Sequence, residues 1–173
     1  MGVTEPRRET DADRDALVRR YHRRIHAVIY RMTGRHADGD DLVQETFLQV
    51  FKSLPRLPGS SNVDAWVYRI AMNVAIDFLR RRGRERRASE RLAIEKSTVS
   101  TTPPSTPDVE LEAAVFKALD QLPPDQRSVF VLRHFEALAH DEIAAIQEVP
   151  VETVRWRLFA ARRKLETLLA PYL

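Results

Sequence analysis

Apolar residues recur at every third or fourth position along most of this chain, the spacing that gives an α-helix one apolar face. The first of these stretches begins near Asp11 and is closed by Gly34, because glycine suits the turn that ends a helix. A second stretch covers residues 41–54, and a third runs from Val63 to Arg82. Runs of alternating polarity, which would indicate half-buried strands, are missing. The pattern therefore predicts an all-α fold.

The helical spacing returns near the end of the chain. One helix is expected on each side of the Pro123–Pro124 pair, because proline ends a helix but is tolerated in the first turn of the next. A short helix over residues 140–147, a turn at residues 148–150 and a longer basic helix from Val151 follow. This order is typical of a helix-turn-helix, whose second helix enters the major groove of DNA. A basic amphipathic helix of some other bundle is the alternative.

A stretch of different composition separates the two helical halves. It covers residues 84–107, begins RERRASERLAIEK and continues STVSTTPPSTP. The second part carries too little apolar surface to offset the entropy lost on ordering it. We therefore expect two small helical domains, residues 11–83 and 108–173, joined by a flexible linker. Residues 1–10 are polar and are expected to form a loose tail.

The charge of the chain is more informative locally than in total. The net charge is only +3, yet basic residues gather at Arg80–Arg82, where the third helix ends, and again at Arg162–Lys164 on the last helix. Arginine is suited to bidentate contacts with phosphate and guanine. Two basic elements far apart in the sequence favour a nucleic-acid partner. The alternative is that these arginines only complement helix dipoles or form a solvated face.

The composition argues against an enzyme and against a membrane protein. The 173 residues include no cysteine, so the chain has no disulfide and no thiolate nucleophile. It also lacks a glycine-rich phosphate loop and a Ser-His-Asp arrangement. No apolar run is long enough to span a bilayer, and the N-terminus does not resemble a signal peptide. We expect a cytoplasmic protein without membrane insertion, catalytic residues or a cofactor.

Two groups of residues resemble metal ligands but are better explained otherwise. His22 and His26 have the i, i+4 spacing of a zinc pair, but a third ligand is lacking and arginines surround them. Asp38, Asp40 and Asp41 stand where a helix begins, and acids there can cap free N–H groups and favour the positive end of the dipole. We therefore expect no metal site.

Four segments together resemble a known family. DLVQETFLQVF, AWVYRIAMNVAIDFLRRR, LDQLPPDQRSVFVLRHFEALAHDEIAAI and VPVETVRWRLFAARRKL are similar, in order and spacing, to the two domains of a bacterial RNA polymerase sigma factor of the extracytoplasmic-function (ECF) group. The resemblance implies a dissociable specificity subunit without chemistry of its own. Its implied partners are core RNA polymerase, promoter DNA and an anti-sigma factor.

The resemblance also assigns roles to residues. It implies that the second helix docks on the coiled coil of the largest polymerase subunit, with contacts from Asp41, Leu42, Gln44, Glu45 and Phe47. It implies that the next loop and helix bind the minus-10 element as a melted single strand, through Leu57, Gly59, Ser60, Ser61, Asn62, Arg69, Asn73 and Arg80. It implies that the helix-turn-helix binds the minus-35 element as duplex, through Arg133, Thr153, Arg155, Trp156, Phe159 and Arg162.

The sequence departs from the family pattern at three places. Leu57-Pro58-Gly59 stands where Phe-Arg-Gly is common, so a different minus-10 preference is expected. Ala137-Leu138-Ala139 replaces Gly-Leu-Ser before the short helix, which removes a serine cap worth about 1 kcal/mol unless His140 or Asp141 substitutes. On the last helix, Trp156 replaces a small residue, and Ala160 stands where an arginine or another polar residue is common.

A different class of protein also fits part of the pattern. A stand-alone helix-turn-helix regulator, with an N-terminal domain for sensing or dimerisation, would contain the same C-terminal motif. Such a regulator would bind a palindromic duplex as a dimer and would not need polymerase. The sequence shows no obvious dimerisation helix, which favours the sigma factor.

Overall fold

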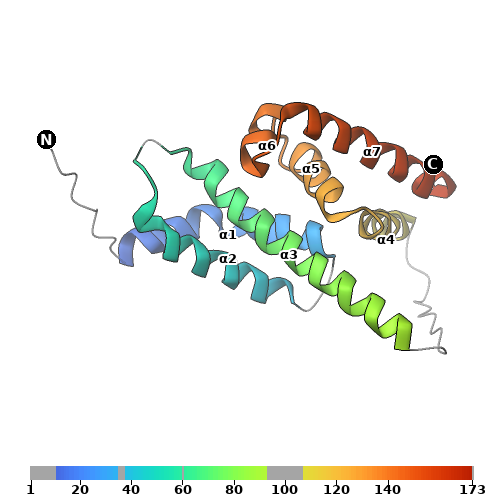
Figure 1. Cartoon of the computed structure of the whole chain (residues 1–173), viewed down its shortest axis with the longest axis horizontal. Coiled ribbons are helices and arrows are strands. Elements are labelled where there is room, and N and C mark those ends of the chain that lie inside the picture. The colour runs from blue at the N-terminus through green and yellow to red at the C-terminus, as the bar shows by residue number, and fades with distance from the viewer. Residues whose placement is uncertain (1–10, 35–37, 60, 93–106, 173) are drawn as a thin grey trace, which may run out of the picture.

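The N-terminal half consists of three long helices and one short turn of 3-10 helix. The structure, a computed structural model, describes residues 11–34, 38–59, 61–92 and 107–172. The elements of this half are α1 (Asp11–Thr33), α2 (Gly39–Ser53), η1 (Leu54–Arg56) and α3 (Val63–Leu92). The three helices pack against one another, as Figure 1 shows. Gly34 has φ 72°, so the predicted end of the first helix is confirmed.

Residues 107–172 of the C-terminal half form four α-helices and one short 3-10 helix. They are α4 (Pro107–Asp120), α5 (Pro124–His134), α6 (His140–Gln147) and α7 (Val151–Leu169), followed by η2 (Ala170–Tyr172). Among the described residues no strand occurs, so the all-α prediction is confirmed. None of the helices within these ranges is long and apolar enough to cross a membrane.

The apolar stripes of the sequence form the cores. In α1, Tyr21, Ile25, Val28 and Met32 are each at most 1% exposed, and they face buried residues of α2 and α3. In the C-terminal half, α7 packs on α5 and α6, while a smaller apolar cluster joins α4 to the end of α7. Each helix is therefore held by its buried face, as amphipathic spacing predicts.

The third helix is longer than predicted. We expected the linker to start at residue 84, but α3 continues to Leu92, so residues 84–92 are helical. This segment is rich in Arg and Glu, which are good helix formers, and Arg86 pairs with Glu90 one turn later at 3.4 Å. The rest of the expected linker, residues 93–106, and the expected tail, residues 1–10, lie outside the described residues.

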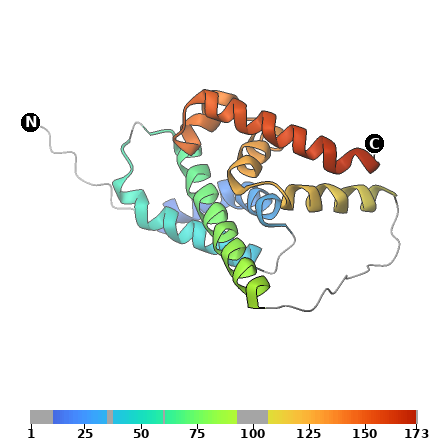
Figure 2. The ribbon, with the colours of Figure 1, turned by 45° about the vertical axis from the view of Figure 1, so that its right-hand side comes forward.

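The two halves pack directly on each other. Helix α3 lies against α5 and α6, and α1 lies against α4 and α5, as both ribbon views show (Figures 1 and 2). One apolar cluster contains buried residues of α1, α2 and α3 together with buried residues of α5, α6 and α7. The sequence predicted two domains but gave no sign of this shared core.

Candidate nucleic-acid and protein interfaces

Helix α7 presents one continuous exposed face. Its opposite face is buried through Val154, Leu158, Ala161 and Leu165. The exposed residues of α7 are Glu152, Arg155, Trp156, Phe159, Arg162, Arg163, Lys164, Glu166 and Thr167, and all but Lys164 lie along one side of the helix at three- and four-residue spacing. The helix forms an outer edge of the molecule in both ribbon views (Figures 1 and 2). Four of the predicted minus-35 residues, Arg155, Trp156, Phe159 and Arg162, therefore share an accessible surface.

The other two predicted minus-35 residues are less accessible. Thr153 is half-buried. Arg133 is also half-buried, and its Nη1 donates a hydrogen bond of 3.0 Å to the carbonyl oxygen of Leu138. This bond ties α5 to the loop that precedes α6, which gives Arg133 a positioning role within the helix-turn-helix.

The turns around α6 show how the helix-turn-helix forms. Glu148 ends α6 in the left-handed conformation, with φ 53° and ψ 44°, and this residue opens the predicted turn. At the other end, Ala139 is the N-cap residue and has no side-chain acceptor. The Glu142 carboxylate accepts a hydrogen bond of 2.7 Å from the Ala139 N–H. This is the bond that the third helical residue makes in a capping box, so the bond that an N-cap serine would accept is missing and the open question of a substitute at His140 or Asp141 finds no capping hydrogen bond here.

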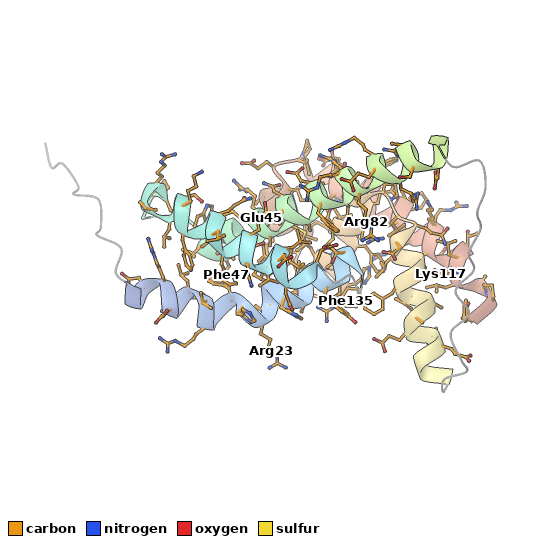
Figure 3. All side chains as sticks on the ribbon, turned by 90° about the horizontal axis from the view of Figure 1, so that it is seen from below. Arg23, Glu45, Phe47, Arg82, Lys117 and Phe135 are labelled. Atoms are coloured by element: carbon orange, nitrogen blue, oxygen red, sulfur yellow. The ribbon has the colours of Figure 1, made fainter. Side chains whose placement is uncertain are left out.

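The exposed face of α2 differs from the predicted docking face. Asp41, Gln44 and Glu45 are exposed, as expected. Leu42 and Phe47, by contrast, are only 4% and 7% exposed, so they belong to the core and cannot serve as exposed docking residues. Figure 3 shows Phe47 on the side of α2 that faces α1, where its ring stacks with that of His22.

Sequence reasoning missed the exposed apolar residue of this face. Leu48 is 67% exposed and lies three and four residues after Glu45 and Gln44. Together with Asp41 these residues form one surface, which we call the α2 face: Asp41, Gln44, Glu45 and Leu48. The signal was present in the sequence, because Leu48 does not belong to the apolar stripe that contains Leu42 and Phe47.

The acids at the start of α2 follow the prediction only in part. Asp38 occupies the N-cap position, but its side chain makes no capping hydrogen bond. Asp40 instead lies 3.4 Å from His26 of α1. Asp40 and Asp41 do stand in the first turn, where a negative charge complements the helix dipole. Within the described residues, no group of three or more His, Asp or Glu side chains is arranged to hold a metal ion.

The loop between α2 and α3 is only partly accessible. Leu57 and Ser61 are half-buried and Gly59 is exposed, while Ser60 lies outside the described residues. The Asn62 side-chain oxygen accepts a hydrogen bond of 3.1 Å from the Ala65 N–H and caps the start of α3. This predicted minus-10 residue therefore has a structural role in the helix.

Arg69 of α3 is held by the C-terminal half. Its guanidinium donates hydrogen bonds to the carbonyl oxygens of Ala145 and Ile146, at 2.7 and 3.2 Å, and to the Glu148 carboxylate at 2.7 Å. Free carbonyls and the negative end of the dipole meet at a helix C-terminus, so a cation is favourable there. Arg69 is thus occupied by the end of α6, whereas Asn73, one turn later, is exposed.

Arg127 of α5 makes the reciprocal contact. Its side chain is 2% exposed and donates hydrogen bonds to the Met32 carbonyl oxygen at the end of α1 and to the Leu119 carbonyl oxygen, the latter at 2.6 Å. Asp120 lies 2.8 Å from the same guanidinium. Each half therefore supplies an arginine to carbonyl groups in the last turn of a helix from the other half.

Further polar contacts join the two halves. Glu136 accepts a hydrogen bond of 2.6 Å from the Tyr68 hydroxyl and lies 3.4 Å from Arg31. Burial and the Glu136 carboxylate together raise the pKa of Tyr68 well above its usual value, so Tyr68 stays a hydrogen-bond donor. Arg80, a predicted minus-10 residue, pairs with Asp125 at 3.0 Å. We call this set of contacts, together with those of Arg69 and Arg127, the interdomain latch.

The comparisons with known proteins agree with the two-part organisation. Residues 17–85 match the family described as Sigma-70 region 2, and residues 112–165 match the family described as Sigma-70, region 4. The RNA polymerase sigma-H factor of Pseudomonas aeruginosa is 34% identical over 169 residues, which cover 92% of this chain and 87% of that protein. The ECF RNA polymerase sigma-E factor of Haemophilus influenzae is 34% identical over 164 residues, which cover 90% of this chain and 86% of that protein.

Other relatives extend this picture. The ECF RNA polymerase sigma factor SigE of Mycolicibacterium smegmatis is 37% identical over 163 residues, which cover 91% of this chain but only 62% of that longer protein. Among solved structures, the sigma factor RpoE in complex with the anti-sigma factor NepR, from Bartonella quintana, is similar with a TM-score of 0.69 and 26% identity, over 91% of this chain and 97% of that one. CnrH in complex with the cytosolic domain of CnrY has the same TM-score at 24% identity and shares the fold. This chain belongs to the ECF group of bacterial RNA polymerase sigma factors.

Proposed function

We propose that this sigma factor uses three surfaces to direct initiation: the α2 face for core polymerase, the loop at 57–62 with α3 for the melted minus-10 element, and the exposed face of α7 for the minus-35 duplex. The observation that carries this assignment is the exposed face of α7. It joins arginines to two aromatic side chains on the second helix of a helix-turn-helix, the element that enters a major groove.

The exposed face of α7 has the composition expected of a surface that binds duplex DNA. Arg162 and Arg163 are exposed and can neutralise phosphates, which positions the helix on DNA. Arg155 lies near the start of the helix, where side chains reach base edges. Glu152 lies 3.9 Å from the Arg155 guanidinium, and both side chains are well exposed, so this pair holds Arg155 weakly and leaves it able to turn to a base.

The α2 face has the composition expected of a protein interface. An exposed leucine surrounded by polar and acidic residues resembles the apolar centre and polar rim of protein contacts. Asp41 and Glu45 give the rim a negative charge, which fits a basic partner surface. We propose, on the basis of the family resemblance, that the coiled coil of the largest polymerase subunit binds this face.

The minus-10 surface requires a change of conformation. In this structure the two halves pack together, an arrangement that we call the closed form. It holds Arg69 against α6 and Arg80 against Asp125. A melted base that stacks or hydrogen-bonds on this side of α3 needs those side chains free. We therefore propose that the interdomain latch opens when polymerase and promoter bind. The N-terminal and C-terminal halves then bind together, each weakly by itself. Binding of one half to polymerase or promoter raises the effective concentration of the other half near its own site.

The protein is a transcription initiation factor by family. We propose that it performs no chemistry itself and works in the cytoplasm, where polymerase and the chromosome are found. We also infer that an anti-sigma factor binds it, because the similar RpoE structure from Bartonella quintana was solved with the anti-sigma factor NepR.

Footprinting tests the three-surface assignment directly. Genomic promoter fragments would be incubated with this protein, with core polymerase, or with both, and then probed with DNase I and with permanganate, which oxidises unpaired thymines. We expect protection at minus-35 and reactive thymines at minus-10 only when both proteins are present. Protection of a palindromic duplex by this protein alone, as a dimer and without melting, would support a stand-alone regulator instead.

A further inference from the structure

The exposed face of α7 contains two large aromatic side chains that the fold does not need. Trp156 is 63% exposed and Phe159 is 61% exposed, although each could bury well over 100 Å² in a core. The packing of α7 is carried by Val154 and Leu158, which are buried on the opposite face. Exposed apolar surface of this kind is usually kept for binding.

The surroundings of the pair indicate what it binds. Arg155 precedes it and Arg162 and Arg163 follow it on the same exposed face. The guanidinium carbon of Arg163 lies 5.9 Å from the centre of the Phe159 ring. Arginines flank the two aromatics and outnumber the acids of the same face, Glu152 and Glu166. Such a surface matches a polyanion better than an apolar protein partner, because the arginines would lose their hydration in an apolar contact.

The major groove offers one apolar group to such side chains. Each base edge there presents hydrogen-bond donors and acceptors, and thymine alone adds a C5 methyl group. Neither phenylalanine nor the carbon faces of tryptophan can read a donor or acceptor pattern, but both can pack on that methyl. We infer that Trp156 and Phe159 are specificity-determining residues that select thymine in the minus-35 element through its C5 methyl group.

This inference rests on the proposed role of α7 and makes it more specific. Trp156 and Phe159 are three residues apart, so they lie one helical turn from each other along the groove. They therefore contact different base steps, and each has its own thymine. Arg155 lies between Glu152 and Trp156 on the exposed face. It can donate hydrogen bonds to the base edges of a neighbouring base pair.

Replacing thymine by deoxyuridine removes only the methyl group and tests the inference in the complete holoenzyme. Each minus-35 thymine, on either strand, would be replaced in turn, and holoenzyme affinity would be measured on each duplex. With wild-type protein we expect the affinity for DNA to fall about fourfold when uracil replaces thymine at one or two positions. This is the change in affinity that corresponds to one methyl group no longer buried. With Trp156→Ala the loss at one of these positions should disappear, and with Phe159→Ala the loss at the other.

Two controls separate the methyl contact from general effects. Tyr172→Ala removes an aromatic that is 52% exposed but lies outside α7, and it should keep the full sensitivity to uracil. Arg162→Ala should weaken binding to all duplexes similarly and keep the same sensitivity, as expected for a phosphate contact. Phe159→Leu, which keeps an apolar side chain, should retain part of the discrimination.

The outcomes are distinguishable. If the wild-type holoenzyme needs the minus-35 element yet binds uracil and thymine equally at every position, the inference is overturned and the proposed function stands. An equal uracil loss in Trp156→Ala and wild type also overturns it for Trp156, and the matching result overturns it for Phe159. If the holoenzyme ignores the minus-35 element altogether, the proposed function of α7 itself has failed.

Discussion

Arg127 shows how a single buried side chain can join parts of the chain that are far apart. Its guanidinium is almost fully buried. It donates hydrogen bonds to carbonyl groups of α1 and α4 and pairs with Asp120. A buried charge is tolerated only when its donors are satisfied. We predict that Arg127→Met lowers the free energy of unfolding by about 2 to 4 kcal/mol, because two buried carbonyls lose their partner. Urea denaturation followed by circular dichroism measures this change.

The matched control for Arg127 is Arg133. It lies on the same helix, is half-buried, and donates one hydrogen bond to the Leu138 carbonyl. Arg133→Met should lower the free energy of unfolding by only about 1 kcal/mol, since one partly solvated hydrogen bond is lost. Equal losses for the two variants would contradict the special role of Arg127.

His134 should make the stability of the protein depend on pH. Burial, followed by the charges of Arg162 and Arg133, lowers the pKa of His134 below its usual value of 6.5. The folded state therefore binds fewer protons than the unfolded state between that lowered pKa and 6.5. The stabilisation is complete above pH 6.5 and is lost as the pH falls through the lowered pKa.

The pH dependence is checked by thermal denaturation. We predict that the melting temperature of the wild-type protein falls between pH 7.5 and pH 5, and that His134→Asn shows a smaller fall. A His134→Asn profile parallel to that of the wild type would show that other groups cause the dependence.

At the scale of elements, amphipathic spacing predicted the helices because each one is held by a buried apolar face. Gly34 and the Pro123–Pro124 pair predicted helix ends correctly, since both act through local backbone geometry. The end of α3 was not predictable in this way. Gly83 lies within that helix, and the Arg- and Glu-rich residues after it are compatible with both a helix and a solvated linker.

The candidate site was predicted less completely than the helices. Family resemblance named Asp41, Gln44 and Glu45, which are exposed on α2, together with Leu42 and Phe47, which are buried in the core. A motif records which positions recur in a family and does not separate exposed residues from buried ones. The apolar stripe makes that separation, and its use here would have replaced Phe47 by Leu48.

Leu48 provides the test of the α2 face. We predict that Leu48→Asp weakens binding to core polymerase about tenfold or more, because a charge replaces the apolar centre of the contact. The fold should be unaffected, since Leu48 is 67% exposed. Fluorescence anisotropy of the labelled protein with core polymerase measures the affinity, and circular dichroism checks the fold.

A second exposed leucine serves as the control for Leu48. Leu111 is 42% exposed and belongs to α4, which Figure 1 shows apart from α2. Leu111→Asp should bind core polymerase with wild-type affinity. If Leu48→Asp also binds as well as the wild type, polymerase contacts another surface.

At the scale of the whole molecule, the closed arrangement is the feature that sequence reasoning could least foresee. Arg69 binds two backbone carbonyls of the other half, those of Ala145 and Ile146, and Arg127 binds one, that of Met32. Every helix end has such carbonyls, so no residue pattern indicates which arginine will meet which helix. The latch also occupies Arg69 and Arg80, two residues predicted to bind the minus-10 element.

Opening of the latch can be followed by fluorescence energy transfer. The chain has no native cysteine, so dyes can be attached at Lys52→Cys on α2 and Glu166→Cys on α7 without background labelling. We predict that the transfer measured in the free protein changes clearly when core polymerase and promoter are added. Arg69→Ala should change transfer in the free protein, whereas Asn73→Ala on the same helix should not. Unchanged transfer in the promoter complex would show that the closed form itself binds the promoter.

Run-off transcription with purified core polymerase tests the central claim most directly. A pool of genomic promoter fragments would be transcribed with and without this protein, and the transcripts would be mapped. The proposed function predicts transcripts that start at specific promoters only when the protein is present, and that disappear when either the minus-35 or the minus-10 element is replaced. No protein-dependent transcript, together with tight binding of a palindromic duplex by the protein alone, would contradict it.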